Sequence, residues 1–247
     1  MKLAALWRHP IKSHGREALT EVTLSPGQTM PWDRRWAVAH EAAKIDGDGW
    51  AHCANFSRAA KEPSLMAITA TSDEAENRVT LRHPDLAPLR FDPDSEEQAF
   101  LDWIRPLMPE GRAQPARIVR APGRGMTDSD FPSISLLNRA SHDAVASHLG
   151  REDLSMERWR GNLHIEGAEA WEEFSWLGRS LRIGDVIFDI RERITRCMAT
   201  TANPATGERD ADTLGALRDG FGHQEFGVYA VVRQGGSLRR GDTVEVL

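Results

Sequence analysis

Short apolar runs separated by turn residues dominate the first 90 residues of the chain. These runs are too short for helices, so they predict a series of strands joined by tight turns. The polar run 72–78 lies between two of them and predicts a hairpin. The expected strands are Leu3–Trp7, Val22–Leu24, Arg35–Ala39, Leu65–Thr71 and Val79–Leu81.

Helical spacing appears in two later segments. Residues 95–98 (Ser-Glu-Glu-Gln) match a capping box, and apolar residues then recur at intervals of three and four until Pro106. A second amphipathic helix is predicted from Arg139 to Leu149, with Asn138 as its N-cap. Residues 121–133 have no periodicity and predict a loop between the two helices.

The strand pattern returns after the second helix. Strands do not alternate with helices, so a doubly wound parallel sheet is not expected. We therefore predict a mostly β fold with peripheral helices (α+β). The change in pattern near residues 90–115 predicts two domains, at residues 1–110 and 111–247. The expected C-terminal strands are Leu163–Ile165, Leu181–Ile190, Arg193–Thr201, Phe226–Arg233 and Thr243–Leu247.

Composition limits the class of protein. The 247 residues are 40% hydrophobic and 28% charged, as in ordinary globular proteins. No apolar run approaches the roughly 18 residues that a bilayer span needs, and charge interrupts the N-terminus too early for a signal peptide. We therefore expect a cytoplasmic protein with no membrane partner. The net charge of −6 argues against a nucleic-acid partner.

One segment, from Ile194 to Asp210, carries unusual chemistry. The sequence has no Gly-rich nucleotide loop, His-Glu-x-x-His, Cys-x-x-Cys or Gly-x-Ser-x-Gly motif. In this segment, however, Cys197 follows Arg196 at the expected end of a strand, and an adjacent arginine favours the thiolate that soft metals bind. A lone cysteine on a strand is also typical of core packing. The residues alone leave both interpretations open.

With the segments around it, this motif resembles the MOSC-domain proteins, the family that includes the mitochondrial amidoxime-reducing component. The similar segments occur in the same order as in that family and extend over nearly the whole chain. They are His9-Pro10-Ile11-Lys12-Ser13, Asp33-Arg34-Arg35-Trp36, Glu62-Pro63, Arg160-Gly161-Asn162, Thr195–Asp210, Phe226-Gly227-Val228-Tyr229 and Gly241-Asp242.

The resemblance implies an N-terminal MOSC-associated β-barrel domain, a MOSC β-barrel domain and a molybdenum cofactor (molybdopterin) between them. It implies that Cys197 is the metal ligand and the catalytic residue. A lysine, an arginine and a hydroxyl also suit the phosphate end of such a cofactor. The cofactor-binding residues that the resemblance implies are Lys12, Ser13, Arg34, Ser133, Arg160, Asn162, Thr195 and Tyr229.

The activity implied by the resemblance is reduction of N-hydroxylated small molecules, such as amidoximes and hydroxylamines. Related proteins that transfer electrons internally carry a four-cysteine iron–sulfur domain, whereas this chain has only Cys53 and Cys197. Electrons are therefore expected from a separate reductase, ferredoxin or cytochrome b5-like protein. The alternative is a sulfur or molybdenum cofactor carrier, in which Cys197 holds a persulfide or the cofactor. The absence of a pyridoxal-phosphate domain here favours the reductase.

Overall fold

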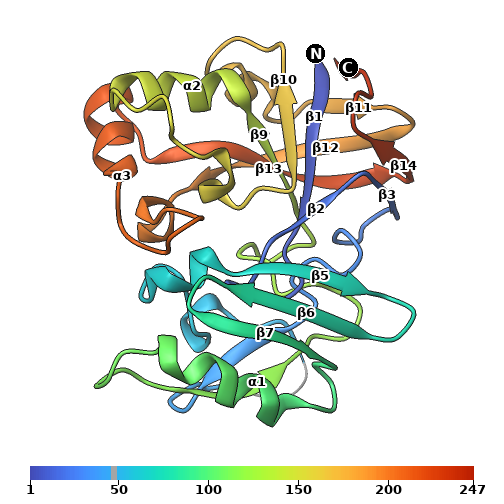
Figure 1. Cartoon of the computed structure of the whole chain (residues 1–247). Helices are drawn as coiled ribbons and strands as arrows, with labels where there is room; N and C mark the ends of the chain where they lie inside the picture. Colours follow the sequence, from blue (N-terminus) through green and yellow to red (C-terminus); the bar gives the residue numbers. More distant parts are fainter. Residues whose placement is uncertain (46–48) are drawn as a thin grey trace.

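The computed structural model describes residues 1–45 and 49–247. Strands form most of the regular structure and short helices lie around them (Figure 1), which confirms the predicted mostly β fold with peripheral helices. A large sheet occupies the upper part of Figure 1 with β3 and β14 beside it, and the sheet of β5, β6 and β7 occupies the lower part. No helix within the described ranges is long and apolar enough to cross a membrane.

The upper sheet has eight strands and includes both ends of the chain. β9 and β10 are parallel, and the other neighbours in this sheet are antiparallel. Its core is built from aliphatic and aromatic side chains such as Leu3, Phe188 and Val228, each 0% exposed. In spatial order the strands are β15 (Val244–Val246), β11 (Ser180–Ile183), β12 (Val186–Thr195), β13 (Glu225–Gln234), β9 (Ile134–Asn138), β10 (Leu163–Glu166), β1 (Lys2–Arg8) and β2 (Glu17–Leu19).

Three smaller sheets complete the fold. The lower core packs Trp36, Phe91 and Phe100 between the small sheets and the first helix. Because β4 pairs with β8, chain segments on both sides of residue 110 share one sheet; the domain boundary at 110/111 stays a prediction. The sheets are β5 (Thr69–Asp73), β6 (Arg78–His83) and β7 (Leu86–Phe91); β4 (Ala37–His40) with β8 (Pro115–Val119); and β3 (Glu21–Leu24) with β14 (Gly236–Arg239).

The helices are short. Asn138 caps α2, because its side-chain oxygen accepts a hydrogen bond from the Ala140 N–H, as the sequence predicts. The predicted capping box at α1 is wrong, because the Ser95 hydroxyl donates to Asp92 instead of capping the helix. The α-helices are α1 (Glu97–Ile104), α2 (Arg139–His148) and α3 (Thr213–Gly215); the 3-10 helices are η1 (Cys53–Asn55), η2 (Pro63–Ala67), η3 (Arg105–Leu107), η4 (Met156–Trp159), η5 (Glu172–Trp176) and η6 (Met198–Thr201); η7 (Ala216–Gly220) is a π-helix.

Three predicted strands differ from the structure. The first half of the expected strand 65–71 is the 3-10 helix η2, which Glu62 caps and Pro63 begins. The expected strand 181–190 is two strands, β11 and β12, separated by a turn at Gly184. The expected strand 193–201 ends at Thr195, and Cys197 lies in the turn that follows.

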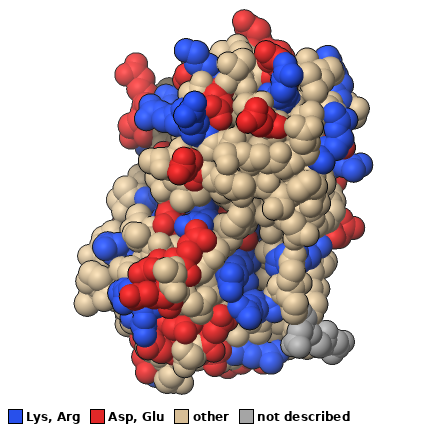
Figure 2. Space-filling view, turned by 90° about the vertical axis from the view of Figure 1, so that its right-hand side faces the viewer, with Lys and Arg blue, Asp and Glu red and all other residues tan. Residues whose placement is uncertain are grey.

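The charged side chains are unevenly distributed on the face in Figure 2. Lys and Arg side chains gather in a hollow at the middle of this face, while Asp and Glu side chains gather beside it on the lower part. The net charge of −6 therefore hides a local basic region between the two parts of the molecule.

Candidate functional site

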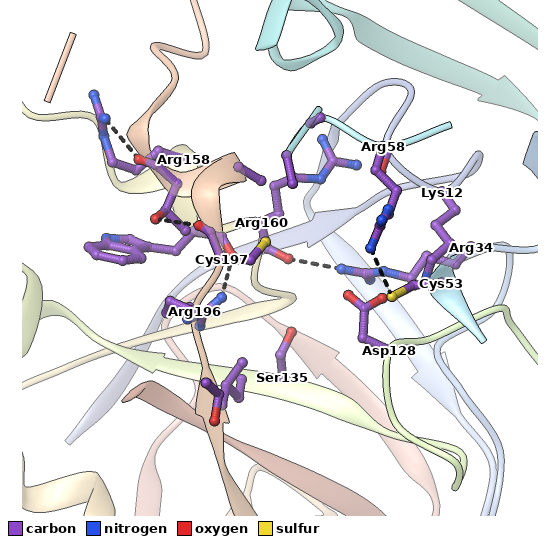
Figure 3. Close-up of a pocket in the computed structure, with 18 of the residues that line it drawn as sticks. Lys12, Arg34, Cys53, Arg58, Asp128, Ser135, Arg158, Arg160, Arg196 and Cys197 are labelled. Carbon is purple, nitrogen blue, oxygen red and sulfur yellow. Dashed lines mark hydrogen bonds and ion pairs between the residues drawn. The ribbon is translucent and has the colours of Figure 1, made fainter. Parts of the chain in front are cut away.

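A cavity of about 260 Å³ brings together most of the predicted site residues (Figure 3). They come from the segments after β1 and before β4, from the C-cap of η4, from the end of β12 and the turn after it, and from the middle of β13. Folding therefore joins positions that are up to about 220 residues apart. The predicted residues that line this cavity are Lys12, Ser13, Arg34, Arg160, Thr195, Cys197 and Tyr229.

Cys197 lies two residues beyond β12, at the N-cap of η6. It is a free, exposed cysteine on the cavity wall, so the core-packing interpretation of this residue is wrong. The neighbouring Arg196 points inward, where its guanidinium donates to the main-chain oxygens of Phe226 and Trp159. We call residues 196–201, from Arg196 to the end of η6, the cysteine turn. Arg196 anchors this turn to the protein interior, while the Cys197 sulfur faces the cavity (Figure 3).

Lys12 is buried at the opposite end of the cavity, where its Nζ donates to Met126 O at 2.7 Å and to Asp128 Oδ1 at 2.6 Å. Burial lowers the pKa of Lys12, and the Asp128 carboxylate opposes this change. Burial tends to raise the pKa of Asp128, but the nearby Lys12 and Arg34 charges outweigh it and hold that pKa below its usual value. At neutral pH the two groups form an ion pair at the cavity.

Arg34 is held between two partners. One N–H group binds the buried carboxylate of Asp33, and another donates to Arg160 O at 3.0 Å. Asp33 also accepts a hydrogen bond from the His9 main-chain N–H at 2.8 Å. Burial alone would raise the pKa of Asp33, but the Arg34 charge outweighs burial and holds this pKa below its usual range. The guanidinium is therefore fixed in place by a counter-ion on the side away from the cavity.

Arg160 has unused hydrogen-bonding capacity. Its Nη2 donates to Gly15 O at 3.1 Å, whereas its Nη1 is buried and has no hydrogen-bond partner in the described part of the chain. Burial and the neighbouring Arg34 charge lower the pKa of Arg160 to about 9. An unpaired buried N–H donor is costly, and an anion in the cavity would remove that cost.

Left-handed backbone conformations accompany these residues. Ser13, Arg34 and Arg160 have φ values of 64°, 50° and 52°, although none is a glycine. Such conformations cost roughly 1–2 kcal/mol per residue and persist only where the surrounding structure imposes them. Three strained residues around one cavity are typical of a binding site.

The predicted residues Asn162 and Ser133 lie beside the cavity, in a small adjoining hollow. Asn162 Oδ1 accepts from the Ser135 N–H and hydroxyl, and its Nδ2 donates to Trp7 O. The Ser133 hydroxyl accepts from Ser129 at 2.7 Å. Both side chains are therefore occupied by protein partners and support the cavity wall.

Two of the predicted contacts come from neighbouring strands. Thr195 ends β12, and Tyr229 lies on β13, which pairs with β12. Burial raises the pKa of the Tyr229 hydroxyl above its usual value, and the Asp128 charge adds to this effect. Tyr229 is therefore a neutral hydroxyl at any physiological pH, able to donate a hydrogen bond into the cavity.

Two family models match this chain. The model described as "MOSC domain" matches residues 126–245, and the model described as "MOSC N-terminal beta barrel domain" matches residues 1–103. The chain is a MOSC-domain protein.

Curated relatives of this MOSC-domain protein include proteins named "Molybdenum cofactor sulfurase". The one from Anopheles gambiae is 31% identical over 92% of this chain and 34% of its own length. The one from Drosophila ananassae is 32% identical over 53% of this chain and 18% of its own length. The chain thus spans about a third or less of these relatives. Among solved structures, the YUAD protein from Bacillus subtilis shares the fold, with a TM-score of 0.51, 13% identity and coverage of 99% of this chain and 94% of that chain.

Several residues of the MOSC-protein cavity were not found from the sequence. Asp128 belongs to the aperiodic loop 121–133, so no pattern marked it. Cys53 lies across the cavity from Cys197 in Figure 3, and the Arg58 guanidinium donates to its sulfur at 3.4 Å. No sequence signal marks Arg58, because the contact with Cys53 arises only from the fold of this segment. The remaining unpredicted lining residues with polar groups are Ser135, Arg158, Arg196 and Thr200.

The side chains of the cavity suit an anionic organic cofactor better than a bare metal ion. No group of three or more His, Cys, Asp or Glu residues within 1–45 and 49–247 is placed to hold a metal. By contrast, Lys12, Arg34, Arg58 and Arg160 all line the cavity, and Asp128 supplies the single carboxylate among its lining residues in the described ranges. This set fits a phosphorylated group at one end and a sulfur-ligated centre near Cys197.

Proposed function

We propose that this MOSC-domain protein binds the molybdenum cofactor in the cavity and uses it to reduce N-hydroxylated small molecules. The observation that carries the proposal is the pairing of an exposed thiol, Cys197, with a buried unpaired guanidinium N–H, Arg160 Nη1, on one cavity. The matching MOSC model and the printed names of the sulfurase relatives support a function connected with this cofactor.

In this proposal the cationic end of the cavity binds the phosphate of the pterin. Lys12 supplies a point charge, Arg34 and Arg160 supply planar N–H donors, and Ser13 supplies a hydroxyl. Asp33 stays ionised beside Arg34 and fixes its orientation. Because these donors are already in place, the protein reorders little when the phosphate enters.

At the other end of the cavity, Cys197 Sγ is the proposed molybdenum ligand. The bound centre supplies two-electron chemistry that removes oxygen from nitrogen. Thr195 and Tyr229 line the cavity beside Cys197, where their hydroxyls can orient a polar substrate. Electrons are proposed to come from a separate reductase, ferredoxin or cytochrome b5-like protein.

Molybdenum content tests the ligand assignment. Protein produced in a molybdenum-replete host is expected to carry near-stoichiometric metal, to lose it in Cys197→Ala and to retain it in Cys53→Ser. Loss in Cys53→Ser with retention in Cys197→Ala would reverse the assignment.

Turnover of benzamidoxime with an artificial reductant tests the activity and is expected for the wild type. Absence of this turnover in metal-loaded protein would contradict the reductase activity.

A second candidate function is a sulfur or cofactor carrier, which the printed name "Molybdenum cofactor sulfurase" favours. The exposed Cys197 sulfur would then hold a persulfide. Release of thiocyanate on treatment with cyanide, lost in Cys197→Ala and retained in Cys53→Ser, would support the carrier. Metal-loaded protein that turns over benzamidoxime and releases no thiocyanate supports the reductase.

A further inference from the structure

A second cavity, a groove of about 530 Å³, lies between the turn before β4 and the loop that follows β8. Residues 25, 28–33 and 35 form one side, and residues 120–125 form the other. The groove shares no lining residue with the Cys197 cavity. No function described above uses it.

The groove is lined by an arginine that is held rigidly but lacks a polar partner. The guanidinium carbon of Arg35 lies 5.0 Å from the ring centroid of Trp32 and 5.1 Å from that of Trp36. The two indoles pack edge to face, with centroids 5.0 Å apart. Cation–π contacts of this kind stabilise the charge through the face of the guanidinium and leave its in-plane N–H groups unused.

The hydrogen-bonding edge of Arg35 is unsatisfied. Its Nε is buried without a hydrogen-bond partner, and no ion pair or hydrogen bond of its guanidinium occurs among the described residues. Buried N–H donors are nearly always paired in native proteins. A fixed guanidinium with free in-plane donors has the geometry that binds a carboxylate or a phosphate through two hydrogen bonds.

The other charges of the groove also favour an anion. Arg120 and Arg124 line it together with Arg35. Arg120 makes an ion pair with Asp94 at 2.9 Å. Arg124 donates mainly to main-chain oxygens, so no carboxylate among the described residues pairs with the charge of Arg124. Among the described residues, Asp33 is the only carboxylate that lines the groove, and Arg34 already neutralises it.

We propose that this groove is a second ligand site, which binds the phosphate or carboxylate group of a small molecule through Arg35. Trp32 and Trp36 hold the guanidinium in place, and Arg120 and Arg124 add the positive field.

The site is connected to the Cys197 cavity through consecutive residues. Asp33 and Arg35 line the groove, whereas Arg34 lines the cavity. Trp32 and Arg34 both have left-handed backbones, with φ values of 64° and 50°, so the turn between the two sites is strained. An anion on Arg35 would favour one arrangement of this turn and so change the affinity of the cavity for its own ligand. This coupling rests on the proposed function, but anion binding in the groove does not.

Calorimetric titration of the full chain with inorganic phosphate, at constant ionic strength, tests the site. Arg35→Gln is expected to weaken binding by about tenfold or more, because it removes a charged pair of hydrogen bonds. Arg35→Lys keeps the charge without the planar fork and is expected to give intermediate affinity. Arg191→Gln, at an exposed position on β12, is the matched control and should bind like the wild type.

Lys12→Gln separates the groove from the cavity, which also presents cations to phosphate. Unchanged phosphate binding in Lys12→Gln, with loss in Arg35→Gln, assigns the ion to the groove. Unchanged binding in both Arg35 variants, or loss in Lys12→Gln alone, overturns the proposal. Titration with malonate distinguishes a carboxylate ligand from a phosphate ligand. Circular dichroism verifies that each variant is folded. Because none of these measurements uses molybdenum, they can fail independently of the proposed function.

Discussion

The two ends of the Cys197 cavity are built in opposite ways. At the cationic end, Lys12, Arg34 and Arg160 are enclosed by protein, and two of the three have left-handed backbones. At the thiol end, Cys197 is exposed and follows a regular strand with an ordinary backbone. The comparison indicates that backbone strain is concentrated at the enclosed cationic end, whereas the thiol end leaves its sulfur accessible without such strain.

The supports behind the two ends differ as well. Buried His9 and His14 lie behind the cationic end, and His14 Nδ1 contacts Lys12 O at 2.7 Å. Behind the thiol end, the buried Arg158 donates to Thr200 O and pairs with Asp210. Both ends therefore contain ion pairs, but only the cationic end also has buried neutral histidines behind it.

Acid is expected to have the largest effect, and to act on the cationic end. Burial lowers the pKa of His9 to about 3 and that of His14 to about 4, below the ordinary value of 6.5. Both imidazoles are neutral in the folded protein, while the unfolded chain takes up protons below about pH 6.5. Unfolding free energy should thus fall by roughly 3 kcal/mol per histidine between pH 6.5 and 4, and stay insensitive to them above pH 6.5.

Urea unfolding at a series of pH values checks this prediction. His14→Gln should flatten the decline between pH 6.5 and 4, because the unfolded variant has one proton fewer to gain. His148→Gln, at an exposed position of α2, is the control and should leave the slope unchanged. Equal slopes in all three proteins would show that His14 does not make the cationic end acid-sensitive.

Arg209 is expected to have an intermediate effect, confined to the thiol end. It donates to Met198 O and Thr201 Oγ1 in the cysteine turn, and to Ala60 O on the other side at 2.9 Å. Arg209→Met should release this turn at a cost of about 1 kcal/mol, because Arg209 is exposed. Alkylation of Cys197 by iodoacetamide, followed by peptide mass spectrometry, should become several-fold faster.

Arg218→Met is the control for this change, since Arg218 is an exposed arginine on η7 that bonds only Gln224 among the described side chains. Its alkylation rate should match the wild type. If Arg209→Met also reacts at the wild-type rate, Arg209 does not position Cys197, and the thiol end is held by Arg158 and Arg196 alone.

Ser13→Gly is expected to have the smallest effect and the opposite sign. Glycine adopts the φ of 64° without strain, so the variant should gain about 0.5–1 kcal/mol of unfolding free energy. Ser147→Gly within α2 should instead lose about 0.5 kcal/mol. Thermal unfolding of both variants measures the difference; a destabilised Ser13→Gly would mean that the hydroxyl contributes more than the strain costs.

Local patterns predicted the elements whose signals lie within a few residues. The Asn138 cap and the hairpin of β5 and β6 follow from hydrogen-bonding side chains and a polar turn. Strand β9 was missed because it is buried on both faces, so that polar and apolar residues do not alternate along it. Strand β8, which precedes β9 in the chain, was missed because the exposed Arg117 interrupts its apolar pattern.

The cavity depended on information of a different kind. Nothing in the spacing of Lys12, Arg34 and Arg160 indicates that they meet; only the resemblance to a family placed them together. Asp128 and Cys53 escaped because each lies outside the similar segments, Asp128 in an irregular loop and Cys53 in the short 3-10 helix η1. Left-handed φ values at Ser13 and Arg34 have no sequence signal, because tertiary contacts impose them on residues that do not favour them.

The pairing of β1 with β10 has a consequence for biosynthesis. Lys12 follows β1 almost directly, while Arg160 stands just before β10 in the chain. In a nascent polypeptide β1 can therefore pair with β2 on one edge while its other edge stays open, and the cationic end of the cavity stays incomplete until about two thirds of translation is over. Any prosthetic group that needs this pocket must be inserted late, after the two distant segments have met.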